Sequence, residues 1–178
     1  MKWPAILILV AIISAAALQP IIEFANVLKE KIVINAAMVN SSRAAQVNAV
    51  NIWGMMDMQA HVDEERFAYY FAEAFSQSLN LTLTEHDVSM YGGETRLRFS
   101  SNDERFNDFE ITVSMERRLY DEYAAEFYGL PDRYITVVTI NLATPYYFRT
   151  YWLRTVNGVS NDDYLLEQTR SFMIQVIN

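Results

Sequence analysis

The chain of 178 residues contains no cysteine, only two histidines and only five glycines. The lack of cysteine excludes disulfide frameworks, thiolate metal sites and cysteine nucleophiles. With His61 and His86 as the only imidazoles, a metal site or an acid–base pair has to rely on carboxylates. The motifs of P-loops, dinucleotide-binding folds, zinc peptidases and serine hydrolases are also missing. We therefore predict no catalytic residue, no metal site and no cofactor, and we expect a protein that is not an enzyme.

Negative charge outnumbers positive charge two to one in the C-terminal two thirds of the chain. Residues 1–56 contain four basic and two acidic residues, whereas residues 57–178 contain ten basic and twenty acidic ones. The ten cations are all arginines scattered between carboxylates, and such a surface repels phosphate backbones. We therefore expect no nucleic-acid partner.

One group of carboxylates and a histidine has two interpretations. Asp57 and His61 are four residues apart, and with Asp63 and Glu64 they are candidates for a metal cluster. The alternative is the solvated start of a helix, where the helix dipole favours negative charge. We favour the helix start because no second imidazole is near.

The N-terminus carries the long apolar run of the sequence. Residues 3–22 have no formal charge, which matches the roughly 20 residues that a helix needs to cross a bilayer. A cleaved signal peptide is the alternative, because Lys2 precedes the run and Ala15, Ala16 and Ala17 offer a cleavage site. We favour a retained membrane span because the helical spacing of apolar residues continues from Leu18 to Val39.

The remaining pattern predicts an α+β fold. We expect a transmembrane helix over 1–22, a helical stem continuous with it over 23–54 that ends near Gly54, and an acidic α+β domain over 55–178. In that domain, Phe67, Phe71 and Phe75 predict a second helix, and period-two alternation then predicts a small antiparallel sheet. Its expected strands include 97–99, 109–115, 134–142, 146–156 and 172–177, with a turn at 143–145 and His86 in a connecting segment. Arg96 or Arg98 is expected to face Glu110 or Glu116 across the sheet.

Three short motifs in the N-terminal helix resemble those of TadE-type pilin-like proteins. They are Ile22-Glu23-Phe24-Ala25, then Asn35-Ala36-Ala37, then Ser42-Arg43-Ala44-Ala45. Two family glycines are replaced here by Ala25 and Ser42. From the two residues before the apolar run, we expect no processing by a prepilin peptidase. The residues that this resemblance assigns to assembly and helix packing are Glu23, Phe24, Ala36, Ala37, Arg43, Ala44 and Ala45.

The resemblance implies a single-pass structural subunit of a cell-surface filament or of a secretion and adherence assembly. Its implied partners are the lipid bilayer and other pilin-like subunits or copies of itself, and its C-terminal domain is expected outside the cytoplasm. A binding domain that acts alone, tethered to the membrane or secreted after signal cleavage, is the alternative.

Glu23 follows the apolar run and lies about 30 Å along the helix from Trp3, at the far edge of a hydrocarbon core. In a lone subunit we expect its carboxylate to reach the headgroups. In an assembly, a partner such as Lys29 of a neighbour has to neutralise it. Both roles, interfacial residue and packing residue, remain open at this point.

Aromatic residues are concentrated in the second half of the chain. One interpretation is a surface for contact with other subunits, because tyrosine and tryptophan supply large contact area at low entropic cost. The other is that these rings fill both faces of a sheet. The residues proposed for the contact surface are Tyr120, Tyr123, Tyr146, Tyr147, Tyr151 and Trp152.

Overall fold

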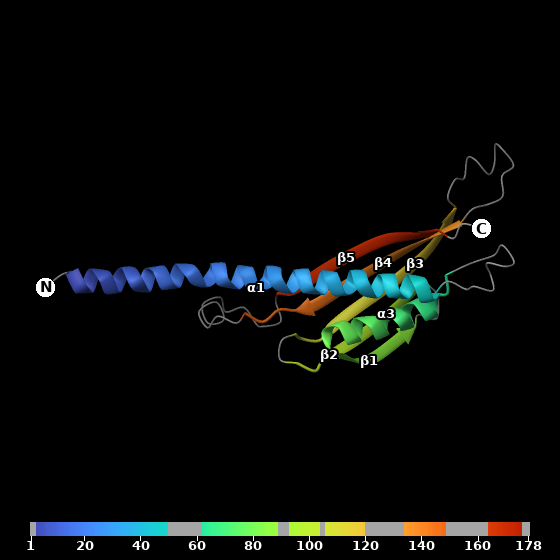
Figure 1. Ribbon diagram of the computed structural model, residues 1–178, viewed down its shortest axis with the longest axis horizontal. Helices are drawn as coiled ribbons and strands as arrows, with labels where there is room; N and C mark the ends of the chain where they lie inside the picture. Colours follow the sequence, from blue (N-terminus) through green and yellow to red (C-terminus); the bar gives the residue numbers. More distant parts are fainter. Residues whose placement is uncertain are drawn as a thin grey trace.

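In the computed structural model, a long N-terminal helix continues into a two-layer domain of helices and one antiparallel sheet (Figure 1). The structure describes residues 3–49, 62–88, 93–103, 106–119, 134–148 and 164–175. The expected α+β class, with a long helix, a second helix and then a small antiparallel sheet, is confirmed. The expected helix end near Gly54 lies outside the described residues.

Helix α1 (Trp3–Ala49) passes through Pro20 without interruption and has two different halves. Its first half is exposed, and no residue of its most apolar 18-residue window is buried. This helix is long and apolar enough to cross a membrane. Its second half packs against helix α3 (Glu64–Leu79) and runs along the sheet (Figure 1).

The start and end of α3 are both encoded locally. Asp63 is the N-cap, and its carboxylate accepts a hydrogen bond from the Arg66 backbone N–H at 3.0 Å. Asn80 ends the helix in the left-handed region, with φ of 54°. The expected helix start at Asp63 and Glu64 is therefore confirmed.

The sheet has five strands in sequence order, each antiparallel to the next. Its helix-covered face and the apolar face of α3 form the core, in which Phe75 contacts Phe99 and Phe109. The opposite face, which we call the open face, carries mostly polar side chains. The strands are β1 (Leu81–Val88), β2 (Glu94–Ser101), β3 (Phe109–Leu119), β4 (Tyr134–Pro145) and β5 (Leu165–Gln175).

Four expectations about the sheet were wrong. Residues 143–145 form no turn, because β4 continues to Pro145 and its neighbours are β3 and β5. Residues 146–148 are not a strand, and the rest of the expected strand 146–156 lies outside the described residues. The last strand begins at Leu165 rather than 172, and His86 lies in β1 opposite Leu97 rather than in a connecting segment.

Candidate functional site

Burial along α1 changes at one residue. Up to Ile22 no side chain of the helix is fully buried, and Glu23 is the first that is, with 2% of its surface exposed. Beyond it, buried residues follow one face of the helix and face the domain, including Val27, Ile34 and Met38. Glu23 therefore marks the junction between the exposed apolar half of α1 and the half that packs against the domain.

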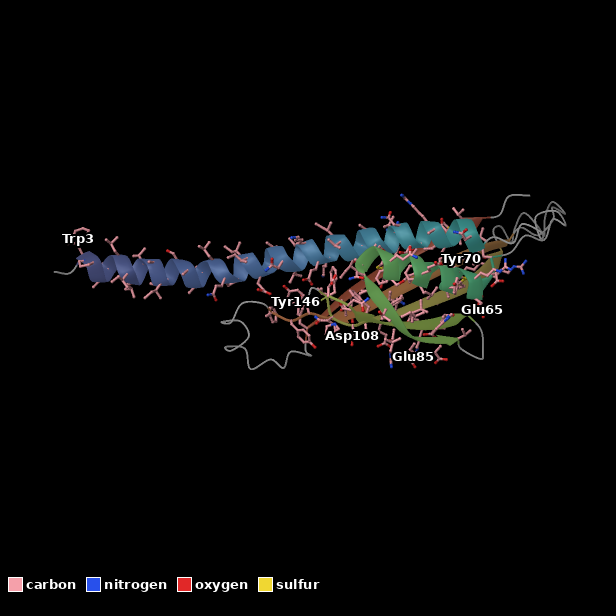
Figure 2. The ribbon with its side chains drawn as sticks, turned by 60° about the horizontal axis from the view of Figure 1, so that its bottom comes forward. Trp3, Glu65, Tyr70, Glu85, Asp108 and Tyr146 are labelled. Atoms are coloured by element: carbon pink, nitrogen blue, oxygen red, sulfur yellow. The ribbon has the colours of Figure 1, made fainter. Side chains whose placement is uncertain are left out.

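The carboxyl group of Glu23 is bound by the protein's own domain. The Tyr146 hydroxyl donates a hydrogen bond to Glu23 Oε1 at 2.8 Å, although the two residues are 123 positions apart. Figure 2 labels Tyr146, next to α1. Tyr146 directly follows β4, and its backbone N–H donates to the Tyr164 carbonyl at 2.8 Å, just before β5. This contact joins the helix to the end of the sheet.

Three aromatic rings surround this contact. Tyr146 packs edge-on against Phe148 and Tyr164, with ring centroids 5.7 Å and 6.0 Å away. Phe148 and Tyr164 complete the triangle at 5.7 Å. Edge-to-face contacts of this kind add to the stability gained by burial. We call Glu23, Tyr146, Phe148 and Tyr164 the junction cluster.

The two expectations for this region were wrong in an informative way. Glu23 does not reach lipid headgroups from a lone subunit, because it is buried against its own chain. Tyr146 does not belong to a contact surface, because it is as buried as Glu23. Each residue was singled out in the sequence, but no spacing connects residues so far apart in the chain.

Loss of the Tyr146 hydroxyl is expected to destabilise the junction. Tyr146→Phe keeps the ring contacts and removes the hydrogen bond to a buried carboxyl group, which costs about 1–3 kcal/mol of the free energy of unfolding. Denaturant unfolding of the full chain in detergent micelles measures this cost. Tyr147→Phe, which changes the neighbouring exposed tyrosine, is the matched control and is expected to change it by less than about 0.5 kcal/mol. Equal effects of the two variants would contradict the role of this hydrogen bond.

The other residues that the resemblance assigned to assembly lie on different sides of α1. Ala37 and Ala45 are buried within the chain's own core, and Ala44 is half-buried. Phe24, Ala36 and Arg43 are exposed. Part of the small-residue pattern thus serves close packing inside the subunit, and part remains available to another molecule.

An apolar stripe runs along the exposed side of α1 and crosses the junction. Its members are spaced three or four residues apart, and Ile32 is 68% exposed. None of them is buried by the described part of the domain, which packs on the other side of the helix. The α1 stripe consists of Ile21, Ala25, Leu28, Ile32 and Ala36.

The expected aromatic contact surface is only partly described. Tyr147 is 40% exposed beside the junction cluster. The positions of Tyr120, Tyr123, Tyr151 and Trp152 lie outside the described residues.

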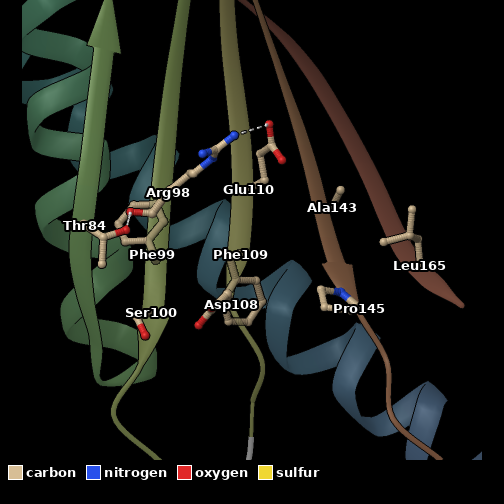
Figure 3. A pocket seen from close by; sticks show the side chains of 10 residues that line it. All are labelled: Thr84, Arg98, Phe99, Ser100, Asp108, Phe109, Glu110, Ala143, Pro145 and Leu165. Atoms are coloured by element: carbon tan, nitrogen blue, oxygen red, sulfur yellow. Dashed lines mark hydrogen bonds and ion pairs between the residues drawn. The ribbon is translucent and has the colours of Figure 1, made fainter. Parts of the chain in front are cut away.

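The open face of the sheet carries ion pairs and a shallow depression (Figure 3). Arg98 lies between two carboxylates, with Nη1 2.9 Å from Glu85 Oε2 and Nη2 4.0 Å from Glu110 Oε1. The expected pairing of Arg98 with Glu110 is thus confirmed, and pairs this exposed contribute little to stability. The depression has a volume of about 430 Å³ and is lined by Thr84, Arg98, Phe99, Ser100, Asp108, Phe109, Glu110, Ala143, Pro145 and Leu165.

A second ion pair lies further along the open face. Arg118 donates a hydrogen bond to Glu116, which lowers the pKa of the Glu116 carboxyl below its usual value and raises the pKa of Arg118. Both side chains are mostly exposed, so this pair is an ordinary surface feature rather than a tuned acid–base site.

Within the described ranges, no three histidine or carboxylate side chains lie close enough together to hold a metal ion. Asp63 serves as a helix cap, and Glu64 accepts a hydrogen bond from the Gly93 backbone N–H at 3.3 Å. Asp57 and His61, the other members of the metal-cluster interpretation, lie outside the described residues.

Comparison with known proteins identifies no relative. The chain matches no protein-family model, no curated protein and no solved structure.

Proposed function

We propose that this protein is a non-enzymatic structural subunit, anchored by α1 in a membrane and assembling with copies of itself or with similar subunits through that helix. The resemblance of the α1 motifs to TadE-type pilin-like proteins suggests an assembly of the cell-surface filament or secretion type. The rest of the proposal depends on the geometry of α1 and not on the resemblance.

The observation that carries the proposal is the α1 stripe. A helix that only anchored and supported a domain would need apolar residues within the bilayer and toward the domain, with polar residues elsewhere. Here Leu28 and Ile32 lie beyond Glu23, on the side away from the domain, and remain exposed. The stripe continues from the apolar half of α1 without interruption, so one surface is available to a neighbour on both sides of the junction.

A second copy is the occupant that fits this surface best. If the apolar half of α1 spans a membrane, all copies have the same orientation, and their stripes lie at the same height. The alanines at 25 and 36 allow close approach of two helices, as small residues do in membrane helix pairs.

Disulfide crosslinking tests the helix contact without background, because the chain contains no cysteine. Ile32→Cys in the stripe is expected to give a crosslinked dimer on oxidation in lipid bilayers. Val47→Cys is the matched control, since it is also exposed on α1 but lies about 22 Å further along the helix and outside the stripe. The predicted yield of dimer is several-fold higher at position 32.

Two results would contradict the helix contact. The first is equal crosslinking at positions 32 and 47, which indicates random collision. The second comes from adding Leu28→Glu, which places a charge inside the stripe, to Ile32→Cys and diluting the protein into excess lipid. Crosslinking at position 32 that stays unchanged under these conditions would contradict the contact.

A tethered binding domain that acts alone is the second candidate function. The depression on the open face favours it, because it combines the Arg98 guanidinium with the exposed apolar side chain of Leu165. The number of copies per complex separates the two candidates, since a binding domain that acts alone remains a monomer at every protein density.

For orientation we propose that the acidic domain lies outside the cytoplasm. The excess of acidic residues in 57–178 and the lack of a basic cluster near them are compatible with this side. Protease added to intact cells is expected to remove the domain, and digestion only after lysis would reverse the orientation. Retention of 3–22 is tested by intact mass, because a chain starting at Leu18 would indicate a cleaved signal peptide.

A further inference from the structure

The exposed side chains beside the junction cluster are aromatic and aliphatic. Tyr147 is 40% exposed, Tyr164 is 39% exposed and Leu165 is 51% exposed. They belong to the end of the sheet where β4 ends and β5 begins, which is also the end that contacts Glu23 (Figures 1 and 2). We call these three residues the interfacial patch.

The height of this patch follows from the length of α1. Glu23 lies about 30 Å along the helix from Trp3, which equals the thickness of a hydrocarbon core. The Tyr146 hydroxyl is 2.8 Å from the Glu23 carboxyl group, and the Tyr164 ring is 6.0 Å from the Tyr146 ring. The patch is therefore within one or two side-chain lengths of the level at which the helix leaves the lipid, provided that α1 is the membrane anchor of the proposed function.

Tyrosine is suited to that level because its ring is apolar and its hydroxyl is polar. Tyrosine and tryptophan are enriched at the headgroup region of membrane proteins for this reason. Phe24 and Ile22 on the adjacent turn of α1 are also exposed and extend the apolar surface around the helix.

We propose that Tyr147, Tyr164 and Leu165 insert into the lipid–water interface and hold the end of the sheet against the bilayer, while the Glu23–Tyr146 hydrogen bond fixes the domain to the helix. The domain is then attached to the membrane at two points, the span and the patch. Asp108 and Leu165 line the same depression, and the C-terminal two thirds of the chain is acidic. The contact is therefore one with zwitterionic lipid, and anionic lipid does not strengthen it.

Spin labels on single cysteines test this contact in the full chain, which has no cysteine of its own. The labelled sites are Tyr147→Cys and Leu165→Cys in the patch, and Tyr69→Cys on α3 as an exposed control at the other end of the domain. A fourth label at Ile13, in the apolar half of α1, reports on the span itself. Each variant is placed in phosphatidylcholine nanodiscs at one copy per disc, and its circular dichroism has to match that of the unaltered chain.

Collisions with oxygen, which concentrates in lipid, are compared with collisions with a nickel chelate, which remains in water. We expect the ratio of oxygen to nickel collisions to be highest at position 13, intermediate at 147 and 165, and lowest at 69. In discs with phosphatidylserine, we expect the ratio of oxygen to nickel collisions at positions 147 and 165 to be unchanged or lower.

The outcomes separate this inference from the proposed function. Nickel access at positions 147 and 165 equal to that at 69, with position 13 still in lipid, would overturn the membrane contact and leave the anchor intact. Protection of positions 147 and 165 from nickel only when several copies share a disc would also overturn the membrane contact, because the patch would then be covered by a second copy. Nickel access at position 13 would overturn the anchor and the contact together.

Discussion

Two arginines in the middle of the apolar half of α1 are expected to release the protein from membranes. Leu9→Arg with Ile13→Arg places two charges near the centre of the span, at about 2.5–3.5 kcal/mol each, and also removes two apolar side chains. The sum of about 6 kcal/mol corresponds to roughly four powers of ten in the insertion equilibrium, since 1.4 kcal/mol is a factor of ten. Flotation of the full chain with liposomes measures the loss.

The chain offers a matched control for this variant. Leu28→Arg with Ile32→Arg changes the same two residue types at the same spacing, on exposed positions beyond Glu23. This pair is expected to leave flotation unchanged, although it disrupts the α1 stripe. Release of the protein from liposomes by both pairs of substitutions, or by neither pair, would contradict a span that ends near Glu23.

Truncation of one phenylalanine is expected to have the largest effect on the stability of the domain. Phe75 is fully buried, and its ring centroid lies 5.7 Å from Phe71, 5.4 Å from Phe99 and 5.8 Å from Phe109. Phe75→Ala removes these contacts and leaves a cavity between α3 and the sheet, which lowers the free energy of unfolding by about 3–5 kcal/mol.

Tyr69→Ala is the control for that truncation, because it removes an aromatic ring from an exposed position of the same helix. This substitution is expected to lower the free energy of unfolding by less than about 1 kcal/mol. Denaturant unfolding followed by circular dichroism compares the two variants. A cost at Tyr69 as large as that at Phe75 would mean that the exposed side of α3 is covered and that the core assigned here is incomplete.

Local signals were sufficient to predict the parts of the fold that depend on neighbours in the sequence. The acidic helix start at Asp63 and Glu64 and the phenylalanine spacing predicted α3, and the alternation around Phe99 and Ile111 predicted β2 and β3. The uncharged run predicted the exposed half of α1. In each case the pattern repeats within a few residues, so one short segment contains the whole signal.

The C-terminal end of β4 and the first half of β5 could not be predicted, because strand pairing overrides local preference there. Pro145 indicated a turn. In the structure it lies beyond the last residue of β4 that pairs with β3, so its lack of an N–H group breaks no hydrogen bond to β3. The first half of β5, Leu165 to Arg170, is rich in leucine, glutamate, glutamine and arginine, which favour helix. Pairing with β4 determines its conformation instead.

The junction was missed for a related reason. Glu23 was singled out by its position after an apolar run, and Tyr146 by its place in an aromatic-rich segment. The contact between them depends on how α1 lies along the sheet, which a single sequence does not encode in any spacing. The structure places the Glu23 carboxyl group in a contact within the subunit rather than among lipid headgroups.

The number of copies in each complex tests the central claim, that α1 is both the anchor and the assembly surface. The full chain, labelled at one introduced cysteine on an exposed site such as Tyr69, is placed in supported bilayers, and photobleaching steps are counted at increasing lipid dilution. We expect several bleaching steps per spot at high density, fewer on dilution, and single steps at the same densities for Ile32→Glu. Single steps at every density for the unaltered α1 sequence would contradict the central claim.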